Sequence, residues 1–195
     1  MRIIAGVAKG RNISAVASAT RPTSDRAREA LFSSLASEFG DFEELNVLDL
    51  YAGTGAIGLE ALSRGASLVH CVEKDESAQK AITSNYEAMK SAQYAGTFQL
   101  FGMSVHRFLQ DRALRPYHFI YIDPPYDVND IDVIETLIQL RDGGFLHPDA
   151  LIAIERNSRV KDISWPEGYA PLREKKYGQA TIFYGICAQN PAENG

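Results

Sequence analysis

From residue 46 onward, short runs of consecutive apolar residues alternate with segments whose apolar residues recur every three or four positions. The first pattern is typical of buried strands and the second of amphipathic helices. The runs NVLDLY, SLVHCVE, TFQLF, FIYID and ALIAIER predict strands. The segments AIGLEALSRG, ESAQKAITSNYEAMKSA, SVHRFLQD and DIDVIETLIQLRDGG predict helices that alternate with them. Repeated strand–helix units of this length predict a mostly parallel sheet covered by helices on both faces.

The two ends of the chain follow different patterns. Near the start, two β-like runs flank Lys9, which predicts a basic β-hairpin. Near the end, two longer β runs meet at Gly178, which predicts an antiparallel hairpin in the otherwise parallel sheet. The predicted divisions are a hairpin extension over residues 1–20, a main α/β domain over 21–188 and a tail over 189–195.

Composition narrows the class of protein. The chain has 195 residues, of which 45% are hydrophobic, and this suits a globular domain with a substantial core. No apolar run approaches the ~20 residues that span a bilayer, and no hydrophobic leader is visible, so we expect a cytoplasmic protein. Cys71 and Cys187 lie in apolar, strand-like runs away from the histidines, so we expect neither a metal site nor a disulfide.

The formal net charge of −5 hides an uneven distribution. The first 28 residues carry six basic side chains and one acidic side chain. Because salt screens charges beyond ~10 Å, such a segment can bind phosphates on an acidic protein. Arg2, Lys9 and Arg11 are candidate RNA contacts, although a solvated arm is the alternative. Arg26 is a further candidate, but Arg26 and Arg28 could instead form surface pairs with neighbouring acids.

A glycine fingerprint follows the first predicted strand of the alternating region. Gly53, Gly55 and Gly58 are spaced as G-x-G-x-x-G between a strand and a helix, where backbone can approach a ligand closely. Glu73 lies twenty positions after Gly53, at the end of the next strand, where a carboxylate can accept hydrogen bonds from ribose hydroxyls. This pattern suits NAD and S-adenosylmethionine equally, and such turns also occur for strand-to-helix packing alone.

Asp49 offers a way to separate the two ligands. At the strand's carboxyl end, its carboxylate would face the negative pyrophosphate of a dinucleotide. S-adenosylmethionine carries no phosphate and has sulfonium and ammonium cations, which an acid would attract. The position therefore favours S-adenosylmethionine, unless Asp49 is only a helix cap and Glu73 an ordinary exposed charge.

A second motif, D-P-P-Y, follows the predicted strand FIYID. Pro124 and Pro125 have no amide donor, and an ionised Asp123 only accepts, so this strand end offers mainly acceptors. Acceptors beside an aromatic ring suit the exocyclic amine of a nucleobase. Asp123 and the Pro124 carbonyl could accept its two N–H bonds and favour its nucleophilic, pyramidal form, while Tyr126 stacks on the base for ~1–3 kcal/mol. The alternative is a rigid turn.

Taken together, these motifs resemble the class I S-adenosylmethionine-dependent methyltransferases, and most closely the bacterial 16S ribosomal RNA guanine-966 N2-methyltransferase family (RsmD-type). The matching segments are RIIAGVAKGR, RPTSDRAREALF, DLYAGTGAIGLEALSRGA, VEKD, DPPY and REKKYGQ. The resemblance implies S-adenosylmethionine as cofactor, N2-methylguanosine in small-subunit rRNA as product, and a seven-stranded Rossmann-like sheet with a C-terminal antiparallel hairpin. We further expect a monomer that acts on rRNA within a small-subunit assembly particle, with naked rRNA as the alternative substrate.

The resemblance assigns roles to individual positions. The residues expected to receive guanine are Asp123, Pro124 and Tyr126. The residues expected around the cofactor are Asp49, Tyr51, Gly53, Thr54, Gly55, Glu73, Ser104 and Val105, with Arg21 and Thr23 beside the site. Ser104 departs from the family pattern, because such enzymes often carry Asp or Asn there near the adenine amine. Either the Ser104 hydroxyl or the Val105 amide would contact adenine.

Three other functions compete with this interpretation. A DNA adenine-N6 methyltransferase would use the same D-P-P-Y chemistry, but 195 residues leave little room for a DNA-recognition domain. Methylation of a protein glutamine is a less well supported function, because enzymes of that kind usually carry Asn at the position of Asp123. A non-catalytic nucleic-acid-binding module is disfavoured by the intact motifs. A nicotinamide dehydrogenase is disfavoured because hydride transfer gives the D-P-P-Y residues no chemical role.

Overall fold

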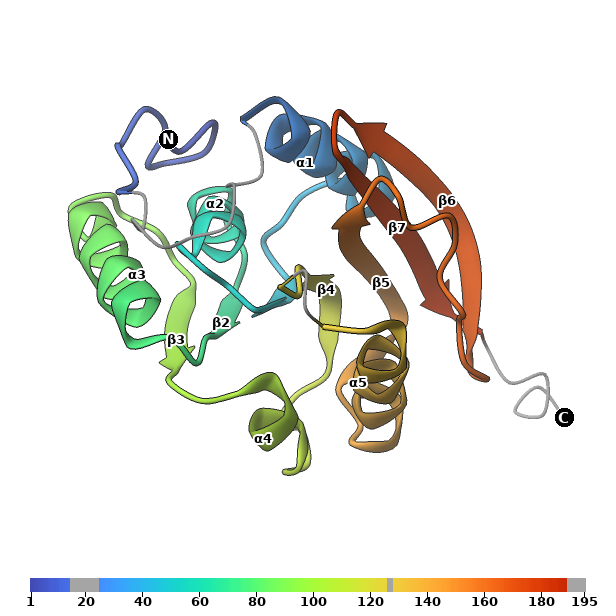
Figure 1. The fold of residues 1–195 in the computed structure, drawn as a ribbon. Coiled ribbons are helices and arrows are strands. Elements are labelled where there is room, and N and C mark those ends of the chain that lie inside the picture. Colours follow the sequence, from blue (N-terminus) through green and yellow to red (C-terminus); the bar gives the residue numbers. More distant parts are fainter. Residues whose placement is uncertain (15–24, 126–127, 189–195) are drawn as a thin grey trace, which may run out of the picture. The chain divides into compact units, whose positions relative to one another are not determined.

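The computed structural model describes residues 1–14, 25–125 and 128–188 (Figure 1). The chain divides into two compact units, residues 1–104 and residues 105–195, and each is described by itself. Within the described ranges, none of the helices has the length and apolar character that a membrane crossing requires.

The first unit is built on three parallel strands. Its elements are α1 (Asp25–Phe39), β1 (Asn46–Leu50), α2 (Ala56–Ser63), β2 (Leu68–Val72), α3 (Glu76–Met89) and β3 (Thr97–Phe101). β2 pairs with β1 on one side and with β3 on the other, with Leu48 opposite His70 and His70 opposite Gln99. Parallel strands need crossovers, which α2 and α3 provide. Both crossover helices therefore begin near the carboxyl ends of the strands, where the glycine fingerprint lies.

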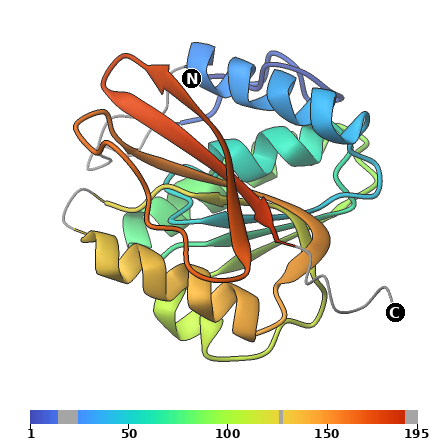
Figure 2. The ribbon, with the colours of Figure 1, turned by 90° about the vertical axis from the view of Figure 1, so that its right-hand side faces the viewer.

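The second unit combines parallel and antiparallel pairing. Its elements are α4 (Val105–Leu109), β4 (Tyr117–Ile122), α5 (Asp130–Asp142), β5 (Leu146–Asn157), β6 (Tyr169–Tyr177) and β7 (Ala180–Cys187). β4 and β5 are parallel, whereas β7 is antiparallel to both β5 and β6. Figure 2 shows β6 and β7 side by side as the hairpin that was expected around Gly178.

The predicted fold class is confirmed. The seven-stranded sheet has the order β3-β2-β1 within the first unit and β4-β5-β7-β6 within the second. β5 is longer than the predicted run ALIAIER, because it begins at Leu146 and includes Pro148. The pairing with β4 shifts between Tyr117 and Phe119, which face Leu146 and Leu151. Pro148 falls in this irregular stretch, where a strand can tolerate a missing amide donor.

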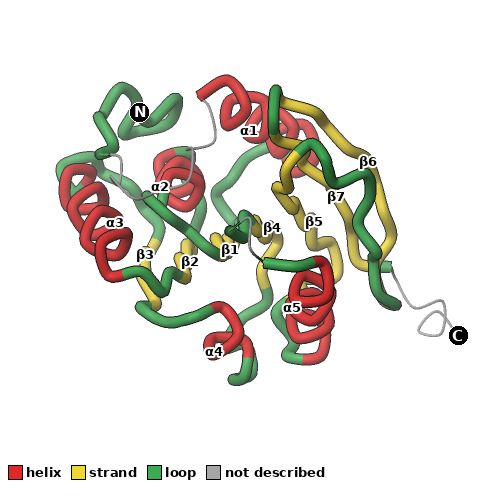
Figure 3. The backbone as a smooth tube through the Cα atoms, in the orientation of Figure 1, coloured by secondary structure: helices red, strands yellow, loops and turns green. Residues whose placement is uncertain are grey.

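The basic N-terminal segment is less regular than the predicted hairpin. Its two runs lie antiparallel and share backbone bonds from Ile3 to Arg11, from Gly10 to Ile3 and from Ile13 to Met1. They form an isolated bridge between Arg2 and Asn12 rather than a pair of named strands, and Figure 3 draws the segment as loop. Several of its backbone groups bond to α2 instead of to a strand. Ile4 and Ala5 donate to the Glu60 carboxylate, and Val7 donates to the Ser63 carbonyl. We call residues 1–14 the basic arm.

The basic arm also buries apolar side chains against the two crossover helices. Ile3, Ala8 and Ile13 form one cluster with Leu59 of α2 and Met89 of α3. The arm is therefore packed onto the first unit rather than extended into solvent. Figure 1 shows it lying over α2 and α3.

Candidate functional site

The turn between β1 and α2 has an unusual backbone. Tyr51, Gly53 and Gly55 have φ angles of 60°, 55° and 73°, all in the left-handed region. Tyr51 is the single non-glycine residue with positive φ in the part of the chain that the structure describes. A bulky residue rarely adopts this conformation, and such outliers concentrate at binding sites. We call residues 51–55 the glycine loop.

The three fingerprint glycines face different surroundings. A Cβ on Gly53 would meet no protein atom within 4 Å, so this position borders open space. A Cβ on Gly55 would lie 3.2 Å from Ile82 of α3, and a Cβ on Gly58 would lie 2.6 Å from the Cys71 sulfur. Gly53 thus leaves room for a ligand beside the backbone, whereas Gly55 and Gly58 allow close packing within the protein.

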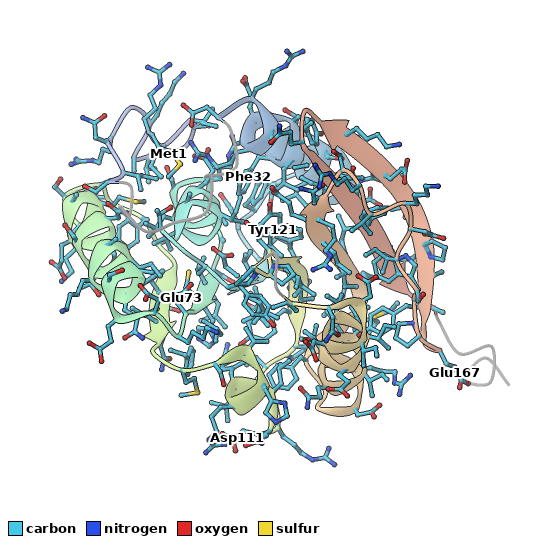
Figure 4. All side chains as sticks on the ribbon, viewed as in Figure 1. Met1, Phe32, Glu73, Asp111, Tyr121 and Glu167 are labelled. Atoms are coloured by element: carbon cyan, nitrogen blue, oxygen red, sulfur yellow. The ribbon has the colours of Figure 1, made fainter. Side chains whose placement is uncertain are left out.

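Glu73 holds the glycine loop from the end of β2, where Figure 4 labels it. One carboxylate oxygen accepts from the Gly53 amide at 2.9 Å, and the other accepts from the Asp75 amide at 2.8 Å. The residue is half-buried. Because an ionised carboxylate has about four lone-pair sites, two protein donors leave acceptor capacity for ligand hydroxyls.

Asp49 lies in the interior beneath the glycine loop. It is 2% exposed, and its Oδ2 atom accepts from the Gly58 amide at 3.0 Å. The Cys71 sulfur lies 3.9 Å from the same oxygen. Asp49 therefore ties α2 to β1 and β2 beneath the glycine loop. The bond from Gly58 agrees with the alternative that Asp49 caps the helix, and an effect of its charge on the cofactor stays a prediction.

Burial gives Asp49 a pH-dependent effect on stability. Loss of hydration raises its pKa from 3.8 to about 7, despite the hydrogen bond from Gly58. The folded state thus holds a proton that the unfolded chain releases near pH 4. Stability from this group is fully present below that pH and is lost as pH rises through about 7.

We expect Asp49→Asn to abolish this dependence, because asparagine keeps an acceptor for Gly58 but does not ionise. The free energy of unfolding of the native chain, relative to the variant, should fall by up to about 1.4 kcal/mol per pH unit between pH 4 and 7. Urea denaturation of both proteins at pH 4.5, 5.5, 6.5 and 8 measures the difference. A difference that stays constant across the series would contradict the assignment.

The candidate RNA contacts have unequal exposure. Arg2, Lys9 and Arg26 are exposed, so their charges are available to a ligand. Arg11 is half-buried, and its guanidinium donates to the Ala88 carbonyl at 2.8 Å, so part of it fastens the basic arm to α3. Arg28 is fully buried, which corrects the expectation of a surface pair, although it does bind Asp25.

Arg28 belongs to a buried ionic cluster that the sequence patterns did not reveal. Glu60 of α2 is fully buried and accepts from Arg64 at 2.8 Å, with Arg28 at 4.0 Å. Arg28 also donates to the Arg2 carbonyl at 2.5 Å. The available signal was a lone acid within the apolar helix AIGLEALS. The cluster joins α1, α2 and the basic arm.

On the second unit, D-P-P-Y follows β4 directly. Asp123 is half-buried and Pro124 is buried, after four consecutive buried residues at the end of the strand. The Pro125 carbonyl accepts from the Val128 amide at 3.0 Å. Tyr126 lies outside the described residues, as do Arg21 and Thr23.

Arg156 supports the chain that follows this motif. Its guanidinium donates to the Val128 carbonyl at 3.0 Å and to the Asp130 carboxylate at 2.9 Å, and 9% of its side chain is exposed. It thus connects β5 to the start of α5. The sequence alone did not set Arg156 apart from the other basic residues near it, because its partners Val128 and Asp130 lie in a different part of the chain.

The two candidates for an adenine contact differ in exposure. Ser104 is exposed at the end of the first unit, and Val105 is buried at the start of the second. Among the described residues, no three His, Cys, Asp or Glu side chains are grouped as a metal ion would require. The first unit thus carries a glycine loop of the kind that binds nucleotides, and the second carries a strand end rich in hydrogen-bond acceptors.

Comparison with known proteins adds independent information. Residues 1–186 match a family described as conserved hypothetical protein 95. The chain is 34% identical over 180 residues to ribosomal RNA small subunit methyltransferase D of Escherichia coli K12, covering 92% of this chain and 86% of that protein.

Solved structures agree with this similarity. The structure described as methyltransferase yhhF from Escherichia coli has a TM-score of 0.82 and 31% identity, covering 96% of this chain and 97% of that one. Magnesium protoporphyrin IX methyltransferase from Synechocystis, solved with bound SAM, has a TM-score of 0.63 and 11% identity, covering 84% and 79%. The second likeness concerns the fold alone.

Proposed function

This chain belongs to the conserved hypothetical protein 95 family, and from that premise we propose that it transfers a methyl group from S-adenosylmethionine to the N2 amine of a guanine in 16S ribosomal RNA. Its 34% identity to ribosomal RNA small subunit methyltransferase D makes it a ribosomal RNA methyltransferase. The observation that carries the finer proposal is D-P-P-Y after β4, an acceptor-rich site suited to an exocyclic amine.

The residues of the glycine loop fit S-adenosylmethionine. When bound, this cofactor supplies an activated methyl group on a sulfonium sulfur. The open space at Gly53 admits it beside the backbone, and Glu73 has acceptor capacity for its ribose hydroxyls. With Gly53, the neighbouring Thr54 and Gly55 would wrap the methionine part of the cofactor. Solved methyltransferases of this fold bind the same cofactor, which supports the choice over NAD.

Asp123 and Pro124 would hold the base. The Asp123 carboxylate and the Pro124 carbonyl accept the two N–H bonds of the guanine amine and stabilise the positive charge that develops on nitrogen. Because the amine is a weak nucleophile, much of the rate comes from holding it in line with the methyl group. The guanine must leave its stack, and Tyr126 is proposed to receive it by stacking.

The exposed cations of the first unit would bind rRNA phosphates. Arg2, Lys9 and Arg26 are placed for this role, and Arg11 contributes with the part of its guanidinium not bonded to Ala88. Such contacts orient RNA without reading its sequence. We further propose a cytoplasmic monomer whose substrate is the rRNA of a small-subunit assembly particle.

The test is methyl transfer with tritiated S-adenosylmethionine to rRNA from a strain that lacks the enzyme, offered both naked and in small subunits. Nucleoside analysis should find the label in N2-methylguanosine of 16S rRNA, with more label in subunits than in naked rRNA. Label found only in N6-methyladenosine of DNA would overturn the substrate. Equal labelling of naked rRNA and subunits would overturn the assembly-particle proposal.

Gly53→Ala should lose cofactor affinity by about tenfold or more, because its Cβ would occupy the open space beside the backbone. Gly40→Ala is a matched control. Gly40 also has positive φ, at 77°, and open space around a Cβ, but it follows α1 away from the loop.

Both substitutions should lower stability by about 1–2 kcal/mol through backbone strain. Isothermal titration with S-adenosylhomocysteine and urea denaturation separate the two effects. Similar cofactor affinities in the two variants would refute the proposed cradle.

A further inference from the structure

Asn85 of α3 connects two segments that the proposed function uses separately. Its side chain is buried, and its amide nitrogen donates to the Thr54 carbonyl in the glycine loop at 3.0 Å. Its amide oxygen accepts from the Ser14 backbone N–H at 2.8 Å, and its nitrogen also reaches the Ser14 carbonyl at 3.3 Å. Ser14 ends the basic arm.

The chemistry of this position is specific to an amide. The contacts use one acceptor and two donors, which a carboxylate cannot supply and an aliphatic side chain cannot replace. All three bonds lie in or next to the buried interior, where an unmade bond costs more than at the surface. The amide group of Asn85 thus bridges two backbones.

Other contacts anchor the basic arm to α1, through Arg28, to the end of α3, through Arg11, and to α2, but none of these bonds reaches the glycine loop. Glu60 accepts from Ile4 and Ala5, and Ser63 donates to the Ala5 carbonyl and accepts from Ala8. Among the described side chains that anchor the arm, Asn85 is the one that also bonds to the glycine loop. A restraint on Thr54 is therefore passed to Ser14 through a single side chain.

We propose that Asn85 is a positioning residue that couples cofactor binding to RNA binding. This inference rests on the proposed function, in which the glycine loop holds S-adenosylmethionine and the basic arm contacts rRNA. A filled loop fixes the Thr54 carbonyl, which holds Asn85, and Asn85 in turn seats the arm for phosphate contact. Because such coupling is reciprocal, bound RNA raises cofactor affinity by the same factor.

The experiment measures the affinity of the full chain for small subunits from the strain that lacks the enzyme, with and without saturating S-adenosylhomocysteine. This product cannot react, so binding is separated from turnover. The native chain should bind about fivefold more tightly when the product is present, the lower end of ordinary allosteric couplings. In Asn85→Asp, which keeps the acceptor and loses both donors, the ratio should fall to about one.

Ser63→Ala is the matched control. It also removes an anchor of the basic arm, at Ala5 and Ala8, but it does not touch the glycine loop. It should weaken RNA binding both with and without the product and keep the fivefold ratio. A ratio reduced equally in both variants would mean that Asn85 acts only as an anchor, and would overturn the coupling.

A second measurement needs no variant. Hydrogen exchange of the native chain, without RNA, should show stronger protection of amides in residues 3–13 when S-adenosylhomocysteine is added. Added protection in a chain that fails to bind rRNA would support the link from the glycine loop to the basic arm, but it would refute both the proposed substrate and the coupling to RNA. The native chain could instead methylate rRNA while S-adenosylhomocysteine changes neither its RNA affinity nor the protection of the basic arm. That result would support the proposed function and overturn the coupling.

Discussion

Asp123→Ala should lower the rate of methyl transfer by about 10²–10³-fold, while affinity for S-adenosylhomocysteine stays unchanged. The variant removes the carboxylate proposed to accept an N–H bond of guanine and to stabilise the charge developing on its nitrogen, an effect of this size at comparable sites. Asp123 lies on the second unit, whereas Gly53 and Glu73 lie on the first, so the contacts proposed for the cofactor remain. Single-turnover kinetics and calorimetric titration measure the two quantities.

Two further variants sharpen this prediction. Asp123→Asn keeps one carbonyl acceptor and should retain an intermediate rate. Asp111→Asn changes an exposed carboxylate of the same unit, paired with Arg107, and should leave both quantities unaltered. Parallel loss of cofactor affinity and turnover in Asp123→Ala would show that the residue supports the fold or the cofactor rather than the base.

Glu60→Ala should lower the free energy of unfolding by about 3–5 kcal/mol, because it removes a buried charge partner and leaves two amides of the basic arm without their acceptor. The Glu60 side chain is fully buried and accepts from Ile4, Ala5 and Arg64. Arg28, also fully buried, would keep Asp25 as its partner but lose the nearby negative charge. Urea denaturation measures the loss.

The same substitution should release the basic arm. Trypsin should then cleave after Lys9 and Arg11 faster than in the native chain. Glu60→Gln keeps acceptor oxygen for the arm amides and should fall between the two. Glu87→Ala removes an exposed partner of Lys90 and should leave the unfolding midpoint unchanged. A Glu60→Ala protein with native stability and a protected arm would contradict the role assigned to the cluster.

Much of the fold followed from local patterns. The strand and helix positions were predictable because side-chain periodicity reports burial wherever one face of an element packs inward. Gly53 and the D-P-P-Y motif could also be recognised in the sequence. Glycine tolerates a positive φ and proline has no amide donor, and both are properties of the individual residue. Pro148 shows the limit of this reading, because its place inside β5 depends on an irregular pairing with β4.

Charge was the property that local patterns could not interpret. Asp49 and Arg28 were expected near ligand or solvent, yet both are buried and bonded within the first unit. Burial of a charged group depends on partners that meet it in space.

The chain's sequence by itself determined its α/β class, its glycine loop and the chemistry of the strand end after β4. Tertiary structure alone decided that Glu60 binds the basic arm, at residues 55 and 56 positions away, and that Asn85 bridges Ser14, 71 positions away, to Thr54. The physical reason is that periodicity and backbone sterics act between near neighbours. A buried hydrogen bond instead requires two distant segments to have already packed together.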